Sequence, residues 1–357
     1  MRWLWAGLLI VLLTVAGAWL FRAELAVMIM TRAVETAMAR DRVAELPDGL
    51  HLFVCGAGSP LPDRHRSGPC LAVIAGDRLF VVDAGTGGAR NLQAAGVLPG
   101  RIAAVFVTHD HSDHIDGLGE LAMLRWTGGG HAQPLPVYGP PGITAVVHGF
   151  NLAYSSDFGH RVAHHGAEVV PPAGAGMRAA PFPAPEPGAA VEVWRDEQLV
   201  VTAFRVAHDP IDPAVGYRFD YAGRSLVISG DTTPVDETVR MASGVDLLAH
   251  EALAADLVGI MEAAARAAGQ DRLAHILADI PDYHTTPVEA AELAARAEVL
   301  MLLLYHIVPP LPLPGLEAAF LRGVRSVYSG EVLVARDGVL ISLPADGSGA
   351  ARRRLRI

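Results

Sequence analysis

The chain begins with an uninterrupted apolar run. Residues 3–21 are 19 positions without a charge, bounded on each side by an arginine. A helix needs roughly 20 such residues to cross the hydrocarbon core of a bilayer. A cleaved signal peptide usually has a shorter apolar region of about 7–15 residues, and here residues 19–21 continue the run beyond a possible cleavage site at 16–18. We therefore predict an uncleaved transmembrane anchor over residues 1–22.

Charges near this run bear on its orientation. Arg22, Arg32, Arg40 and Arg42 follow the apolar run, whereas only Arg2 and the α-amine precede it. The positive-inside rule therefore favours a cytoplasmic body. A very short leader before the span is more typical of an exported bacterial domain. Between these alternatives we predict a bacterial inner-membrane protein whose larger domain faces the periplasm.

Beyond the anchor, the pattern of apolar positions changes. Residues 23–48 continue a helical pattern of mixed polarity, which predicts a stalk. From 49 to 345, short β-rich runs alternate with helical stretches and Gly/Pro punctuation, which predicts one α/β sandwich with helices on the sheet faces. The expected strands are 51–55, 70–75, 79–82, 103–107, 199–206, 217–219, 225–229 and 300–304. The expected helices are 91–96, 118–126, 253–268 and 287–297.

Composition narrows the range of partners. Residues 171–190, rich in Pro, Ala and Gly, predict a surface loop, and 346–357 a basic C-terminal tail. The net charge is −10, and the arginines at 352–354 form the single basic run. Nucleic-acid binding draws heavily on basic side chains that contact phosphates. We therefore expect a small-molecule partner in preference to a nucleic acid.

The two cysteines, Cys55 and Cys70, are too far apart in sequence to form the closely spaced pair of a zinc finger. We interpret them as two small buried side chains. A disulfide between them becomes plausible if the domain lies outside the cytoplasm.

The densest chemistry lies at residues 108–114, Thr-His-Asp-His-Ser-Asp-His. These residues follow the expected strand 103–107 and precede a helix, so they form a loop at the carboxyl end of a strand. Three imidazoles and two carboxylates within six residues cannot all enter an apolar core, because polar groups buried without partners are costly. Nitrogen and oxygen donors crowded this closely indicate zinc or a similar metal.

The H-x-H-x-D-H pattern of residues 109–114 resembles the signature of the metallo-β-lactamase superfamily. The other motifs of that family are present in order. Asp83 matches the buried carboxylate that supports the metal loop, and His208, Asp231 and His306 match the later ligands, each after an apolar strand. The resemblance implies an αββα sandwich.

The same resemblance implies two divalent cations, expected to be Zn²⁺, held by seven side chains. The first site would comprise His109, His111 and His208, and the second Asp113, His114 and His306, with Asp231 bridging the two. A carboxylate bridge keeps two cations close enough to share one hydroxide, and metal ions lower the pKa of bound water. Manganese and iron accept the same donors.

Further motifs resemble the ribonuclease Z and arylsulfatase-like branch of the superfamily. They are a Gly-rich hairpin at 56–60 followed by Gly-Pro at 68–69, a Tyr-Gly-Pro turn at 138–140, His-Glu-Ala at 250–252 and His-Thr-Thr at 284–286. Together the motifs cover residues 50 to about 310. Members that cleave β-lactams commonly carry Cys where this chain has Asp231, so that activity is disfavoured.

The last two motifs imply an acid pair. Glu251 would orient His284 and favour its protonated form, so that His284 could protonate the leaving oxygen. The alternative is that both residues make structural hydrogen bonds. Asp113, His284 and Glu251 are the predicted catalytic residues.

One segment departs from ribonuclease Z, which carries a long tRNA-gripping arm between the third motif and the bridging Asp. Here His208 and Asp231 are 23 residues apart, and 214–227 are expected to form a strand hairpin turning at 222–223. The interval from His114 to His208 is long instead, about 94 residues. Its segment 151–165 either borders the substrate pocket or forms a solvated patch, and it contains Tyr154, Phe158, His160, His164 and His165.

We therefore predict a dinuclear hydrolase that cleaves a small phosphodiester, sulfate ester or related ester. The alternative is a tRNA 3′-processing endonuclease of the ribonuclease Z type, favoured by the branch motifs. A third hypothesis is a non-catalytic membrane-bound metal-binding protein. The intact ligand set and acid pair argue against this third hypothesis.

Overall fold

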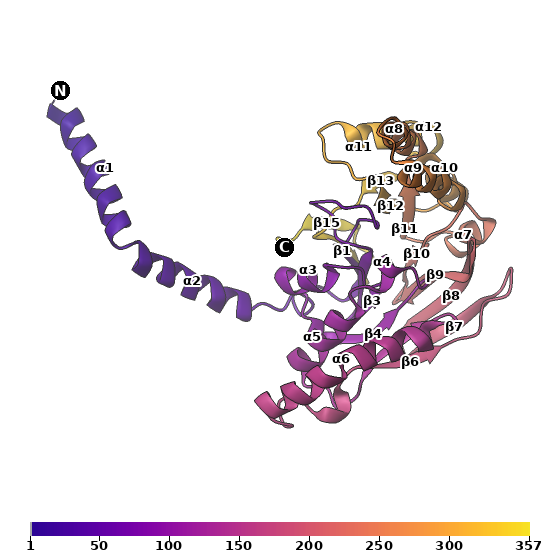
Figure 1. The fold of residues 1–357 in the computed structure, drawn as a ribbon, viewed down its shortest axis with the longest axis horizontal. Coiled ribbons are helices and arrows are strands. Elements are labelled where there is room, and N and C mark those ends of the chain that lie inside the picture. Colours follow the sequence, from indigo (N-terminus) through magenta and orange to yellow (C-terminus); the bar gives the residue numbers. More distant parts are fainter. Residues whose placement is uncertain (1) are drawn as a thin grey trace. The chain divides into compact units, whose positions relative to one another are not determined.

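The computed structural model describes residues 2–357, and Met1, the first residue of the predicted anchor, lies outside them (Figure 1). The chain separates into a unit that ends at Arg42 and a unit over Val43–Ile357. The first unit contains α1 (Arg2–Leu20) and α2 (Arg22–Met38), neither of which has a buried residue. Within residues 2–357, α1 is the one helix long and apolar enough to cross a membrane by length and composition, and a signal sequence would meet the same test.

Fifteen strands in the described residues form two sheets. The first has eight strands in the order β15 (Ala351–Arg354), β14 (Val339–Pro344), β1 (Gly49–Gly56), β2 (Cys70–Ala75), β3 (Arg78–Val82), β4 (Ile102–Phe106), β5 (Leu135–Gly139) and β6 (Met177–Pro181). The second has seven strands in the order β13 (Glu331–Val334), β12 (Met301–Val308), β11 (Leu247–Leu253), β10 (Arg224–Ile228), β9 (Ile211–Tyr221), β8 (Leu199–His208) and β7 (Ala190–Arg195).

The sheets pack face to face because alternate residues of each strand point to opposite faces. In β1, Leu50, Leu52 and Val54 belong to the core between the sheets, whereas Phe53 packs on the outer side. Phe106 of β4 lies in the inner core, where its ring contacts aromatic rings of both sheets.

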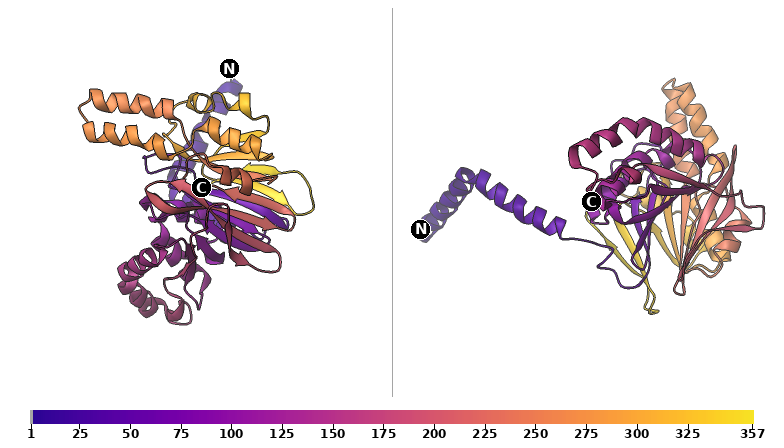
Figure 2. Two further views of the ribbon diagram at one scale, coloured as in Figure 1. Left: turned by 90° about the vertical axis from the view of Figure 1, so that its right-hand side faces the viewer. Right: turned by 90° about the horizontal axis from the view of Figure 1, so that it is seen from below.

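Helices cover both outer faces, which completes the αββα sandwich that the sequence predicts (Figures 1 and 2). The first sheet is covered by α3 (Gly88–Ala95), α5 (Leu118–Gly129) and α6 (Ile143–His165). The second is covered by α7 (Asp236–Met241), α10 (Pro287–Arg296), α11 (Leu316–Phe320) and α12 (Val324–Val327). The pair α8 (Ala255–Ala267) and α9 (Asp271–Asp279) packs through its own small core. The remaining short elements are α4 (Ser112–Ile115), η1 (Pro99–Arg101), η2 (Pro172–Gly174) and η3 (Ile280–Tyr283).

Three segments differ from their expected form. The expected loop 171–190 contains β6, which pairs in parallel with β5. Within the expected tail 346–357, β15 pairs with β14 and extends the sheet. The expected helical stalk 23–48 is helical as far as Met38, where α2 ends. The two strands have a tertiary cause, because β5 and β14 supply the hydrogen bonds that order β6 and β15. The expected hairpin at 222–223 is confirmed by the β9–β10 register.

The interpretation of Cys55 and Cys70 as separate buried thiols is wrong, because the two form a disulfide. Cys55 lies near the end of β1 and Cys70 begins β2. These strands are antiparallel neighbours with an irregular register beside Cys55. The Cα atoms are 5.0 Å apart, within the range that disulfides span. The bond closes the base of the loop 56–69.

Candidate metal centre

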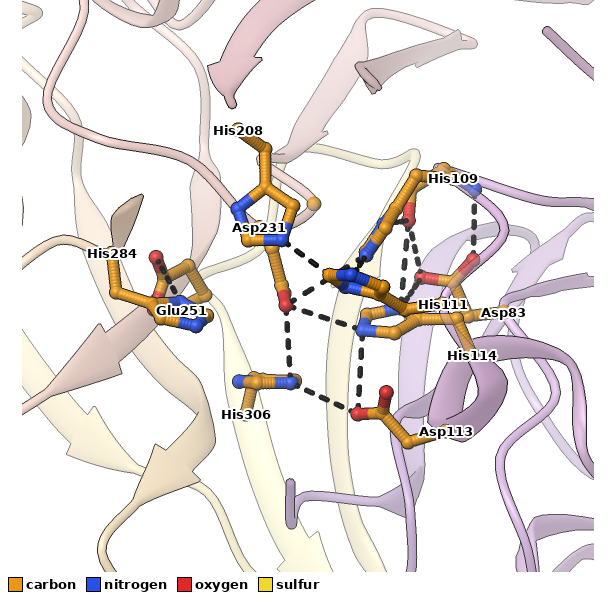
Figure 3. A network of polar contacts seen from close by, with 12 residues as sticks. Asp83, His109, His111, Asp113, His114, His208, Asp231, Glu251, His284 and His306 are labelled. Atoms are coloured by element: carbon orange, nitrogen blue, oxygen red, sulfur yellow. Dashed lines mark hydrogen bonds and ion pairs between the residues drawn. The ribbon is translucent and has the colours of Figure 1, made fainter. Parts of the chain in front are cut away.

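The predicted ligands come from strands that end at the same edge of the sandwich. His109 and His111 lie on the loop after β4, and His208 is the last residue of β8. Asp231 follows β10, and His306 lies in the second half of β12. Strands β8, β10 and β12 share one direction, because β9 is antiparallel to both β8 and β10 while β10, β11 and β12 are parallel. Their carboxyl-terminal ends therefore deliver these side chains to one cluster (Figure 3).

The first group is His109, His111 and His208, whose ligand atoms converge. His109 Nε2 lies 3.0 Å from His111 Nδ1, and His208 Nε2 lies 3.3 Å from the same atom. Zn–N bonds of about 2.0–2.1 Å at a tetrahedral angle place two nitrogens roughly 3.3 Å apart. The spacing therefore suits three imidazoles around one ion.

Hydrogen bonds behind these rings set their tautomers. Thr108 Oγ1 donates to Asp83 Oδ2 at 2.9 Å, so it accepts from His109 Nδ1 at 3.0 Å. His208 Nδ1 donates to the carbonyl of Tyr283 at 2.9 Å. Each Nε2 then carries a lone pair directed at the cluster, which is the usual support for a metal-binding histidine.

The second group is Asp113, His114 and His306, with Asp231 between the two groups. Asp231 Oδ2 lies 3.3 Å from His114 Nε2, 3.2 Å from His306 Nε2 and 4.0 Å from His109 Nε2. Asp113 Oδ2 lies 3.3 Å from His306 Nε2. Asp231 is thus the one carboxylate placed to face both groups, as a bridging ligand requires.

Two residues of the cluster adopt an unusual backbone. Asp83 has φ 57° and His306 has φ 47°, the left-handed region that non-glycine residues rarely adopt. Strain of this kind persists where the surroundings hold the residue in place. Asp83 accepts hydrogen bonds from the backbone N–H of Thr108 at 2.8 Å and from His114 Nδ1 at 2.8 Å. Its backbone conformation therefore serves to anchor the loop that carries the ligands.

Unpartnered atoms test whether cations fit the cluster. Among the buried polar atoms of residues 2–357, His114 Nε2 and Asp231 Oδ1 have no hydrogen-bond partner. Asp83 accepts from His114 Nδ1, which leaves His114 Nε2 to face Asp231 and to bind either a proton or a cation. Buried polar groups normally have partners. Divalent cations would satisfy these atoms, so the residues fit the two ions that the sequence predicts.

Burial and charge set the protonation of the cluster. Burial lowers the pKa of His109 well below its ordinary value and also lowers the pKa of His111 and His208, which favours the neutral, ligating form. Burial raises the pKa of Asp231, but the neighbouring His306 and His114 outweigh it and hold that pKa well below its usual range. Burial also lowers the pKa of His114, but Asp231 and Asp83 raise it well above its ordinary value. A cation on His114 Nε2 would therefore compete with a proton.

The predicted acid pair lies beside the cluster. His284 Nδ1 donates to Glu251 Oε1 at 3.0 Å, and the His284 ring stacks on His306 with centroids 5.6 Å apart. Burial lowers the pKa of His284, but Glu251 and then Asp231 outweigh it and raise this pKa to about 9. The imidazolium needed of a proton donor is therefore favoured.

Glu251 is fully buried and holds two loops together. Its Oε1 accepts the backbone N–H of Thr285 at 2.9 Å and that of Thr232 at 3.3 Å. The first bond fixes the segment of His284 and the second fixes the segment that follows Asp231. A capping box between Thr286 and Glu289 then begins α10. The local sequence therefore ends the loop that carries His284 at Thr286, where α10 begins.

The segment 151–165 forms the C-terminal part of α6. Phe158 packs against Trp126, and Tyr154 joins the same small cluster. His160, His164 and His165 are exposed, and none belongs to a metal-binding group among the described residues. These histidines therefore fit a solvated patch, the second of the two predicted alternatives.

Sequence reasoning gave no role to Thr108 or Asp337. Thr108 links Asp83 to His109 through its hydroxyl, and its place directly before the histidines was the available signal. Asp337 is buried and accepts the backbone N–H groups of Ala57 at 2.9 Å and Ser67 at 2.7 Å, so it orders the loop 56–69. No local pattern marks Asp337, because its partners are about 270 residues away.

Fold and site together define a hydrolase of the class that gathers histidine and aspartate side chains for divalent metals at one edge of an αββα sandwich. Residues 78–307 match the family model described as Beta-lactamase superfamily domain. The chain belongs to this metallo-β-lactamase superfamily, as its motifs indicate.

Relatives and solved structures agree with that membership. Ribonuclease Z of Mycolicibacterium gilvum is 36% identical over 270 residues, which are 75% of this chain and 87% of that protein. Ribonuclease Z of Mycobacterium bovis is 35% identical over 290 residues, 81% of this chain and 96% of the relative. The crystal structure of the short form of human tRNase Z has a TM-score of 0.57 at 22% identity, and the match covers 82% of this chain and 99% of that one. At that identity the structural likeness establishes the fold.

Proposed function

We propose that the chain is a metal-dependent phosphodiesterase, and that cleavage of an RNA precursor in the manner of a tRNA 3′-processing enzyme is its best supported activity. The observation that carries the proposal is the placement of the Glu251–His284 pair against two convergent ligand groups. The ribonuclease Z relatives support RNA as the substrate, because the match covers most of their length. This reverses the sequence-based ranking, which put a small ester first.

The residues have distinct roles in this proposal. Two divalent cations, for which zinc is our first choice, would supply Lewis-acid activation of water and of a phosphoryl oxygen. His109, His111 and His208 would hold one, Asp113, His114 and His306 the other, and Asp231 both. His284 would donate a proton to the departing alkoxide, and Glu251 would keep its ring oriented and protonated.

A second candidate is a small phosphodiester or sulfate ester cleaved outside the cytoplasm. The segment between His208 and Asp231 is occupied by β9 and β10, which leaves no room for a tRNA-gripping arm. The disulfide favours an oxidising compartment, since such bonds are rare in the cytosol. An apolar α1 is consistent with a periplasmic domain anchored in the inner membrane.

One assay separates the candidates. The full chain, purified in detergent and supplied with Zn²⁺ or Mn²⁺, should be given a precursor tRNA with a 3′ trailer, bis(p-nitrophenyl) phosphate and p-nitrophenyl sulfate. The proposal expects cleavage of the precursor at one position, with activity on the activated diester. Activity on the small esters alone would establish the second candidate. Hydrolysis of none of the three by metal-loaded protein would refute both.

A further inference from the structure

A small cavity lies beside the first ligand group, and its walls differ in character from the metal cluster. It has a volume of about 200 Å³. Pro140, Pro141, Ile211 and Pro213 provide apolar walls, and Asp110 provides a carboxylate. Pockets for drug-sized ligands usually enclose about 300–1,000 Å³. The cavity therefore suits one ring rather than a whole substrate.

Three segments of the chain line the cavity, and two of them also carry a proposed metal ligand. Asp110 directly follows His109, and Ile211, three residues after His208, is the first residue of β9. The rings of His109 and His208 are 4.9 Å apart. The third side is the turn after β5, where Gly142 has φ 115° and so permits the chain to enter α6 directly after the two prolines. A group in the cavity would therefore lie beside the reacting centre.

His109 lines the cavity, whereas His284 and Glu251 do not. Figure 3 shows His284 and Glu251 on one side and His109 on the other, with Asp231 between them. A leaving group that takes its proton from His284 lies on the His284 side. The ester group that the phosphate retains then lies toward His109 and the cavity.

Charge selects what can occupy the cavity. Asp110 and Asp212 line it, and no arginine does. Asp212 pairs with Arg205 outside the lining. A further phosphate would meet two carboxylates in the cavity, whereas a ring with N–H donors would find apolar walls and acceptors. Carboxylates accept hydrogen bonds from amino groups such as that of cytosine.

We infer that this cavity is a specificity subsite for a planar ring bearing an amino group, such as an amino-substituted nucleobase, on the retained side of the phosphodiester. The inference rests on the proposed phosphodiesterase function and deepens it. It adds Ile211 and Asp212 as residues that determine specificity.

Two substrates with one leaving group test the subsite. Cytidine 5′-(p-nitrophenyl phosphate) and methyl p-nitrophenyl phosphate both release nitrophenolate, so they differ in the retained group. The cytidine ester should have a KM lower by about 10-fold or more, the scale of discrimination that apolar contacts provide. Ile211→Trp should fill the cavity and lower the ratio of kcat/KM for the cytidine ester to kcat/KM for the methyl ester by about 10-fold. The matched control is Ile260→Trp, on an exposed position of α8.

Two further measurements test the role of Asp212 and the direct binding of a nucleotide to the cavity. Asp212→Asn should reduce the preference for the cytidine ester over the uridine ester. Titration calorimetry with cytidine 5′-monophosphate and methyl phosphate should give tighter binding of the nucleotide, lost in Ile211→Trp. Equal affinity for both ligands, or equal effects of Ile211→Trp on both esters, would overturn the subsite. If neither ester is hydrolysed, the phosphodiesterase proposal fails, and calorimetry still decides on the cavity.

Discussion

At the scale of single residues, hydrogen bonds from side chains outside the two ligand groups fix the orientation and tautomer of the proposed ligands. Asp83 binds the Thr108 backbone, the Thr108 hydroxyl and His114 Nδ1, and a positive φ orients it for this work. The consequence is that His109 turns a lone pair, rather than an N–H group, toward the cluster. Asp231 then supplies the negative charge between the two groups.

The first prediction follows from that position of Asp231. Asp231→Ala removes the one carboxylate that faces both groups, so the variant should lose most of its bound metal and nearly all activity. Elemental analysis by mass spectrometry measures the metal, and Asp236→Ala, at the exposed first residue of α7, is the control. Wild-type protein that retains less than about one ion per chain after reconstitution would contradict the dinuclear site.

The second prediction separates proton donation from binding. His284→Ala should leave the metal content unchanged and lower turnover of alkyl esters by roughly 10²–10⁴-fold, the range of general acid catalysis. Nitrophenyl esters should suffer much less, because nitrophenolate departs without a proton. Glu251→Gln should show the same dependence more weakly. Equal losses for both kinds of ester at full metal content would make His284 a binding or structural residue.

The pH dependence should have the same origin. The pKa of His284 is raised to about 9, so the donor is protonated below that pH and loses its proton above it. Turnover of alkyl esters should therefore fall on the alkaline side, whereas turnover of nitrophenyl esters should not share that fall. A pH–rate profile for each ester in wild type and His284→Ala measures the difference. Identical alkaline limbs in wild type for the two esters would speak against the assignment.

At the scale of elements, the site depends on a loop that is tied at several points. The disulfide closes the loop 56–69, and the side chain of Asp337 accepts backbone N–H groups at both ends of that loop. The carbonyl of Ala57 accepts the backbone N–H of Ile307, next to His306. The loop is therefore coupled to the strand that carries the last ligand.

The disulfide should contribute measurably to stability. The paired cysteines are 15 residues apart, and closing a loop of that length stabilises the folded state by about 3 kcal/mol in the chain-entropy model. Cys55→Ser combined with Cys70→Ser should lower the unfolding free energy by about that amount in a denaturant titration. A reducing agent should destabilise the wild type and leave the double variant unaffected. An unchanged midpoint in the double variant would show that the loop needs no crosslink.

At the scale of the whole molecule, a catalytic unit is joined to two helices without buried residues. We predict that α1 is an uncleaved anchor. The protein should then stay in the membrane fraction after a high-salt wash, and mass spectrometry should find its N-terminus at or next to Met1. A mature N-terminus near Trp19 would identify a cleaved signal peptide. A reporter fused to the C-terminus tests the predicted periplasmic side.

The sequence alone determined the fold class and the residues that meet at the site. The reason is that the motifs resemble those of the metallo-β-lactamase superfamily and follow or lie within apolar strands, so the order of the strands places the ligands at one edge. His208 and Asp231 needed no distant information beyond the common direction of β8 and β10.

Only the tertiary structure decided the features that depend on which segments pair with one another. Cys55 meets Cys70 because β1 and β2 are neighbours, and β6 and β15 are strands because β5 and β14 supply their hydrogen bonds. The nitrogen that each histidine turns toward the cluster depends on partners such as the Tyr283 carbonyl, 75 residues from His208. The cavity beside His109 likewise exists because the turns after β5 and β8 approach the metal loop together. Such contacts leave no periodic trace in the sequence, because periodicity records which face of an element is buried and not which element covers it.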